Sequence, residues 1–208
     1  MGQVTTLTSS DGHSFEVYEA APDGNPMGAI VVVQEIFGVN AHIREVADGY
    51  AGAGYRAMAP ALFDRVEPKI ELGYAGADMM QGIEIARGKL DVSDALQDIQ
   101  TTVQSASESG TVGLVGYCFG GLMAFLSACK VSGLACAVSY YGGGIAAQLE
   151  QSPNIPLQFH FAELDAHIPM SDVDLIRNAY PHCPLFTYDA DHGFNCDHRA
   201  SFDEAAAD

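Results

Sequence analysis

Hydrophobic positions along the chain form short apolar runs that alternate with longer amphipathic stretches. The apolar runs are typical of strands that are buried on both faces. Such strands are predicted at 29–34, 55–60, 111–116, 133–142, 155–163 and 183–190. Helical periodicity lies between them at 41–54, 119–130 and 171–180, and two further helices within 74–108 meet near Gly88. Strands that alternate with helices predict an α/β fold, with a mostly parallel sheet and helices on both faces.

The two ends of the chain depart from this alternation. Residues 5–20 predict a two-stranded hairpin that turns at Asp11-Gly12. The last long helix is expected to be capped by Ser171. The final residues, SFDEAAAD, begin a helical pattern that stops with the sequence, so we expect the C-terminal helix to be truncated. A length of 208 residues favours a single domain over residues 1–208.

The charge of the chain limits the partners that it can bind. A net charge of −18 repels nucleic acid and anionic membranes, so neither is predicted as a partner. No apolar stretch reaches the roughly 18–20 residues that cross a bilayer. The five cysteines are an odd number without a repeated C-x-x-C spacing, which favours free thiols in a reducing cytoplasm. We therefore predict a cytoplasmic protein that acts on a small molecule, as a monomer or a small homo-oligomer.

One cysteine lies in a setting that is typical of a nucleophile. In VGLVGYCFGG, residues 112–121, Gly116, Cys118 and Gly120 form a G-x-C-x-G motif between a predicted strand and a predicted helix. Glycines at these positions let strand and helix approach closely, while the central side chain projects from a strained turn. The start of the helix also favours a thiolate. The alternative is a buried structural cysteine at a tight turn.

An acid and a base follow the candidate nucleophile in the order that the α/β-hydrolase fold requires. Asp165 lies just past one predicted strand, and His192 lies just past the next. The imidazole would accept the thiol proton, and the carboxylate would orient the imidazole. Glu35 follows an apolar strand directly, so it is expected to be buried without an obvious partner, which is rare for glutamate. Its alternative is a carboxylate that turns out to solvent.

Taken together, these segments resemble the dienelactone hydrolase (carboxymethylenebutenolidase) family. The resemblance runs through DGHSFEVY, QEIFGVN, GYRAMAPALF, VGLVGYCFGG, YYGGG, ELDAHIP and DHGF. It implies an α/β-hydrolase fold with a Cys118–His192–Asp165 triad. It also implies that an ester or lactone is cleaved through a covalent acyl-enzyme, without a metal or an organic cofactor.

The resemblance implies roles for residues around the triad. Glu35 would accept a hydrogen bond from the resting thiol until substrate displaces it, which would keep Cys118 largely protonated. The backbone N–H groups of Ile36 and Phe119 would form the oxyanion hole. Phe37, Tyr140 and Tyr141 match positions of an aromatic substrate pocket, although the tyrosines are equally typical of core packing.

The chain departs from the family pattern where the substrate carboxylate is bound. Cys196 stands four residues after the triad histidine, and residues near Gly76 stand at the second site, where the family has arginines. Arg87, Lys89 and Arg199 are nearby in sequence but do not match the motif. The natural substrate is therefore left open among esters, lactones and thioesters.

Two other kinds of function remain as alternatives. The stretch 189–198 gathers side chains that zinc accepts as ligands, namely Asp191, His192, Cys196, Asp197 and His198. Their spacing matches no standard ligand pattern, and a zinc ion on His192 would dismantle the triad. The second alternative is a non-catalytic or stress-response protein that keeps the hydrolase fold. Reactivity of the nucleophile would distinguish the enzyme from such a protein.

Overall fold

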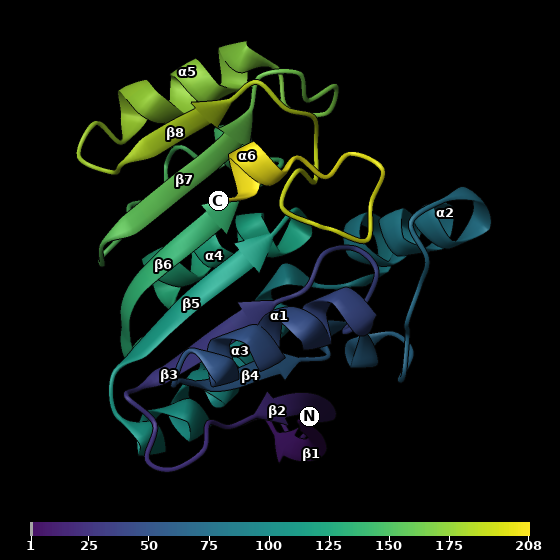
Figure 1. The fold of residues 1–208 in the computed structure, drawn as a ribbon, viewed down its shortest axis with the longest axis vertical. Coiled ribbons are helices and arrows are strands. Elements are labelled where there is room, and N and C mark those ends of the chain that lie inside the picture. Colours follow the sequence, from purple (N-terminus) through teal and green to yellow (C-terminus); the bar gives the residue numbers. More distant parts are fainter. Residues whose placement is uncertain (1) are drawn as a thin grey trace.

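The computed structural model describes residues 2–208 and is organised around one eight-stranded sheet (Figure 1). The strand order is β1-β2-β4-β3-β5-β6-β7-β8. The strands are β1 (Gln3–Thr8), β2 (Ser14–Ala20), β3 (Ala29–Val33), β4 (Arg56–Pro60), β5 (Val112–Tyr117), β6 (Leu134–Tyr140), β7 (Leu157–Ala162) and β8 (Leu185–Tyr188). Strands β4 to β8 along this order pair in parallel, whereas β1 and β2 are antiparallel. This arrangement confirms the predicted α/β-hydrolase type of sheet.

Helices cover both faces of the sheet. They are α1 (Ala41–Gly52), α2 (Gly76–Glu84), α3 (Val92–Ala106), α4 (Phe119–Lys130), α5 (Met170–Ala179) and α6 (Glu204–Ala207). In Figure 1, α1 lies in front of the sheet and α4 lies behind it. A π-helical turn, Ile85–Lys89, joins α2 to the segment before α3, close to the predicted break at Gly88. None of the helices within residues 2–208 has the length and hydropathy needed to cross a membrane.

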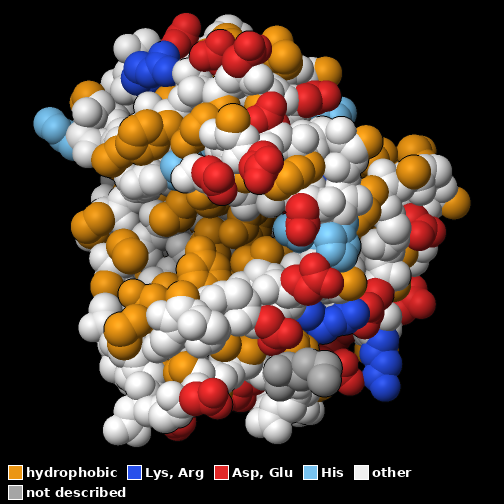
Figure 2. Space-filling model, in the orientation of Figure 1, with side chains coloured by type: hydrophobic (Ala, Val, Ile, Leu, Met, Phe, Trp, Pro, Cys, Tyr) orange, Lys and Arg blue, Asp and Glu red, His pale blue; other side chains and the backbone are white. Residues whose placement is uncertain are grey.

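The core follows from the continuous apolar runs of the central strands. All six residues of β5 are buried, and β3 is buried except for the half-buried Ile30. Residues opposite each other on neighbouring strands form an aromatic row, in which Tyr140 stacks on Tyr117 at 5.2 Å and on His160 at 4.4 Å between ring centroids. Over the middle of the sheet the face in view is hollowed, with hydrophobic side chains on its floor (Figure 2).

Local differences from the sequence predictions have clear causes. Helix α5 begins at Met170, with Pro169 as its N-cap residue and no side-chain cap, so the predicted Ser171 cap is wrong. Proline fixes φ near its helix-compatible value, which makes it suitable at a helix start. The N-terminal hairpin forms as predicted, with Gly12 at a φ of 89°. The single domain over 1–208 stays a prediction, and Met1 lies outside the described residues.

Candidate active site

Cys118 occupies a tight turn between β5 and α4. Its backbone has a φ of 55° and a ψ of −111°, a conformation that non-glycine residues rarely adopt. A Cβ on Gly116 would lie 1.8 Å from the carbonyl oxygen of Gly120, and a Cβ on Gly120 would lie 2.3 Å from that of Val33. The glycines therefore let α4 begin directly against β5 and β3. The turn places the thiol at the carboxyl ends of these strands, as in a nucleophile elbow.

The acid, which follows β7, and the histidine, which follows β8, form a hydrogen-bonded chain with this thiol. His192 Nε2 lies 3.1 Å from Cys118 Sγ, and His192 Nδ1 lies 2.6 Å from Asp165 Oδ2. The other carboxylate oxygen of Asp165 accepts hydrogen bonds from the backbone N–H groups of His167 and Ile168, at 2.7 and 3.2 Å. Asp165 and His192 are both buried. The three side chains thus form one hydrogen-bonded chain from carboxylate through imidazole to sulfur.

This chain of hydrogen bonds determines the protonation of the imidazole. Burial lowers the pKa of His192, but the hydrogen bonds with Asp165 and Cys118 outweigh it and raise that pKa to about 10. Burial raises the pKa of Asp165, yet its hydrogen bond with His192 keeps it below its usual value. The environment therefore favours a carboxylate beside an imidazolium at neutral pH.

Glu35 does not lie on the thiol in this structure. It is buried, with 1% of its surface exposed, and its Oε1 accepts a hydrogen bond from Arg199 Nη1 at 3.1 Å. The hydrogen-bond partner of Cys118 is His192 instead. Two expectations are therefore wrong for this state, namely that Glu35 lacks a partner and that it holds the thiol. The reason is a positive charge that the sequence could not place, because Arg199 comes from the loop after β8 and compensates the buried carboxylate.

Arg199 itself packs against a pair of aromatic rings. Its guanidinium carbon lies 5.8 Å from the ring centroids of both Phe37 and Tyr74, within cation–π range. The two rings meet edge to face, with centroids 4.6 Å apart. Glu35 Oε2 is buried without a hydrogen-bond partner among residues 2–208. The carboxylate therefore keeps one unused acceptor next to the cation.

The thiol opens into a cavity of about 250 Å³. Its walls are mainly apolar and include side chains of α2, such as Met79 and Ile83. Ile36, Phe37 and Phe119 also line it, next to Cys118. The N–H group of Phe119, the first residue of α4, has no acceptor inside the helix. The cavity thus brings the sulfur of Cys118, an apolar surface and the two residues of the expected oxyanion hole together.

The two predicted pocket tyrosines do not line this cavity. Tyr140 is half-buried and lies in the aromatic row on the face of the sheet, between Tyr117 and His160. Tyr141 is fully buried, with its ring centroid 5.1 Å from that of His192. The prediction that they contact substrate is therefore wrong for this cavity. The alternative for both tyrosines was core packing. This alternative holds for Tyr141, which is buried in the core and packs against the imidazole of His192.

The cations named from the sequence have different surroundings. Arg87 lines the cavity from the π-helical turn, is exposed, and has no carboxylate partner within the described part of the chain. Lys89 pairs with Glu84 at 3.0 Å instead. Arg199 also lines the cavity, but its charge is balanced by Glu35. Arg87 is therefore the cation that is free to meet an anionic group in the cavity.

The stretch 189–198 does not gather into one metal site. His192 faces Cys118, and the buried Cys196 donates to the hydroxyl of Tyr74 at 3.5 Å. Asp197 and His198 lie away from both, against α1. The zinc alternative that includes His192 is therefore not supported by the arrangement.

Sequence reasoning missed two residues of the site. His167 lines the cavity and packs edge-on against His192, with ring centroids 5.4 Å apart. Its position two residues after Asp165 was a usable signal, because the loop that carries the acid also reaches the cavity. Tyr74, which packs on Arg199, stands at the start of the stretch 74–108 that was predicted to be helical, and nothing in the sequence near it indicated a contact with Arg199.

A nucleophile elbow after a central parallel strand, followed by an acid and a histidine at later strand ends, defines the class of α/β-hydrolase-fold proteins. The comparisons with known proteins narrow this class. The model of the dienelactone hydrolase family matches residues 15–208. The chain belongs to the dienelactone hydrolase family, and so to the hydrolases of esters and lactones.

Individual relatives agree with this assignment. The chain is 34% identical to the carboxymethylenebutenolidase of Pseudomonas putida, over 86% of this chain and 78% of that one. It is 37% identical to a protein of Synechocystis sp. that is provisionally named a carboxymethylenebutenolidase, over 98% of this chain and 92% of that one. A crystal structure from Klebsiella pneumoniae, provisionally described as a dienelactone hydrolase, superposes with a TM-score of 0.85 at 28% identity. That superposition covers 100% of this chain and 93% of the other.

Proposed function

We propose that this protein cleaves a small ester or lactone with Cys118 as the nucleophile, through a covalent acyl-enzyme. The observation that carries the proposal is the hydrogen-bonded chain Asp165–His192–Cys118 at the wall of an apolar cavity. A thiol 3.1 Å from an imidazole, which is oriented in turn by a carboxylate, is the arrangement that activates a nucleophile. Family membership supports the same class of reaction.

In the first half of the reaction, the Cys118 proton resides on His192 and the thiolate attacks the carbonyl carbon. A bond forms between Sγ and carbon while the π electron pair of the carbonyl moves onto oxygen. The N–H groups of Ile36 and Phe119 would stabilise this oxyanion. When the carbonyl reforms, the carbon–oxygen bond of the ester breaks and the leaving alkoxide takes the proton from His192. In a lactone, this alcohol remains attached to the acyl group.

In the second half, a water molecule resolves the thioester. Neutral His192 takes a proton from the water as the resulting hydroxide attacks the acyl carbon. The bond between carbon and Sγ then breaks and returns the thiolate, with the proton left on the imidazole. Asp165 stabilises the imidazolium in both halves, because its carboxylate lies 2.6 Å from Nδ1.

Glu35 would act here as a charge partner of Arg199 rather than as the resting partner of the thiol. Their contact of 3.1 Å leaves Cys118 hydrogen-bonded to His192 before substrate arrives. The sulfur would therefore already be paired with the His192 imidazolium in the free enzyme. Substrate-gated activation by Glu35 would require Arg199 to release the carboxylate first.

The cavity favours a small and largely apolar substrate. Its volume of about 250 Å³ lies below the usual range of roughly 300–1,000 Å³ for drug-sized ligands. Arg199 is neutralised by Glu35, whereas the exposed Arg87 is not. A carboxylate on the substrate would thus be bound at the Arg87 side of the cavity, by a residue that does not match the arginines of the family.

The test is steady-state hydrolysis of a dienelactone, a neutral aryl ester and a thioester by wild type and Cys118→Ala. Cys136→Ala is the matched control, because Cys136 is an exposed thiol on β6 outside this cavity. We expect turnover of at least one substrate to be lost in Cys118→Ala and kept in Cys136→Ala. Absence of turnover in wild type on the whole panel would instead favour a non-catalytic protein with this fold.

A further inference from the structure

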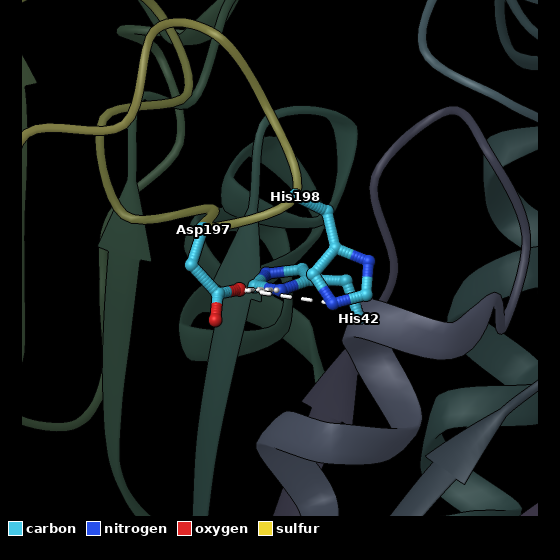
Figure 3. Close-up of side chains that lie close together, drawn as sticks. All are labelled: His42, Asp197 and His198. Carbon is cyan, nitrogen blue, oxygen red and sulfur yellow. Dashed lines mark hydrogen bonds and ion pairs between the residues drawn. The ribbon is translucent and has the colours of Figure 1, made fainter.

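A cluster of side chains of the kinds that bind metal ions lies where α1 meets the loop that follows β8. Figure 3 shows His42 from the first turn of α1 beside Asp197 and His198 from that loop. His42 Nδ1 lies 3.1 Å from Asp197 Oδ1, and His198 Nε2 lies 4.0 Å from the same oxygen. One ligand atom from each residue lies within 4.8 Å of the other two. The cluster contains none of the residues of the triad.

We propose that His42, Asp197 and His198 bind one Zn²⁺ ion. Zinc is bound in proteins by imidazole nitrogens and carboxylate oxygens at about 2.0–2.2 Å in a tetrahedral arrangement. The edges of such a tetrahedron are about 3.3–3.6 Å long. The separations of 3.1 and 4.0 Å bracket this length. Three protein ligands leave the fourth position to water.

The side chains differ in the freedom with which they can adjust to an ion. His42 is buried, with 3% of its surface exposed, and Asp197 is its hydrogen-bond partner through Nδ1. Its Nε2 is buried without a partner among residues 2–208. Nδ1 is the ring nitrogen of His42 that faces Asp197, so this ligand atom already lies in the cluster. His198 and Asp197 are more exposed and can close the remaining distance by side-chain rotation.

The side chains around the cluster favour binding of a cation over the contact that His198 now makes with Glu45. His198 Nε2 lies 2.8 Å from Glu45 Oε2, and the glutamate side chain is 60% exposed. Exchange of this exposed contact for a metal bond costs little, because exposed ion pairs contribute little to stability. The carboxylates of Glu45 and Asp197, in a chain with a net charge of −18, attract a divalent ion to this surface.

An ion at this position would join α1 to the loop that carries two active-site residues. Asp197 and His198 directly precede Arg199, which pairs with Glu35, and His192 lies earlier in the same loop. Zinc would therefore act as a brace that fixes the position of Arg199. This role is independent of the acyl transfer proposed above, since no ligand of the ion touches Cys118.

The experiment is calorimetric titration of the full chain with Zn²⁺. It uses a Cys118→Ala background, because the thiol of Cys118 and the imidazole of His192 could themselves bind zinc in the wild type. His198→Ala and Asp197→Asn are added to this background, because both side chains are at the surface and their loss should not prevent folding. His182→Ala, which removes an exposed histidine elsewhere, is the matched control. Titration with Co²⁺ gives a spectrum that distinguishes nitrogen and oxygen ligands from thiolate.

We expect one equivalent of Zn²⁺ to bind and to raise the unfolding temperature of the background protein. Each ligand substitution should weaken binding at least tenfold, and His182→Ala should leave it unchanged. Bound Co²⁺ should lack a thiolate charge-transfer band. The proposal is overturned if the background protein binds no zinc, if both ligand variants bind it as the background does, or if cobalt shows thiolate ligation.

Discussion

Substitution of Arg199 by Met removes the one positive charge that pairs with the buried Glu35 among residues 2–208. Glu35 is 1% exposed, and the Arg199 side chain is 14% exposed. Removal of one partner of a buried ion pair leaves an uncompensated charge and typically costs about 3–5 kcal/mol. Methionine keeps an apolar stem against Phe37 and Tyr74, so the packing loss is small. We expect Arg199→Met to lower the free energy of unfolding by about 3–5 kcal/mol at pH 7.

Urea unfolding at equilibrium measures this loss, and thermal unfolding should show a decrease of about 6–20 °C. The same substitution at Arg177 is the control, because its pair with Asp174 is exposed and should contribute at most about 1 kcal/mol. The double variant Glu35→Gln/Arg199→Met should recover most of the loss, because no buried charge remains. Equal losses for Arg199→Met and Arg177→Met would refute the reasoning, as would a double variant less stable than Arg199→Met.

Three further outcomes follow from the site. Gly116→Ala should lower the free energy of unfolding by about 3 kcal/mol or more and abolish activity, because the added Cβ would overlap a backbone oxygen. Gly49→Ala, on the exposed face of α1, is the control and should raise the free energy of unfolding by about 0.5–1 kcal/mol. Urea unfolding of both variants measures these changes. Since the pKa of His192 is raised to about 10, kcat/KM should fall as pH rises through that value and the imidazolium is lost. Asp165→Asn removes a group that raises this pKa, so the fall should move to lower pH in the pH–rate profile. Arg87→Ala should raise KM about tenfold for an anionic ester and leave KM for a neutral ester unchanged, as steady-state kinetics would show.

The raised pKa of His192 also links stability to pH. A group whose pKa is higher in the folded state contributes stability that is complete below its unfolded pKa, about 6.5. This contribution is lost as pH rises from there through about 10, the folded value. Part of the stability of the triad region should therefore disappear in alkaline solution.

The parts of the fold that were predictable are those fixed by local sequence. The continuous apolar runs placed the central strands, because β5 is buried on both faces and has no polar position to interrupt the pattern. The elbow was also predictable, since Gly116 and Gly120 are required by close backbone contacts next to Cys118. Asp165 and His192 could be placed because parallel strands end at the same edge of a sheet.

The parts that were not predictable depend on contacts between distant segments. The pairing of Glu35 with Arg199 joins residues 164 positions apart, and no local pattern identifies that partner. Tyr140 and Tyr141 are adjacent in sequence, but neither lines the cavity. Tyr140 lies in the aromatic row on the sheet, and Tyr141 lies in the core beside the imidazole of His192. The Ser171 cap was preferred by residue type, yet the N-cap residue is Pro169, two positions earlier, and the helix begins at Met170.

The central claim is that the acyl group is transferred to the sulfur of Cys118. The most direct measurement is mass spectrometry of the intact protein and its Cys118 peptide, after an acid quench within the first turnover of an activated ester. We predict an added acyl mass on Cys118 that forms and decays with turnover, and none on this peptide in Cys118→Ala. Turnover that persists in Cys118→Ala, or an adduct on another residue that forms and decays at the catalytic rate, would contradict the account.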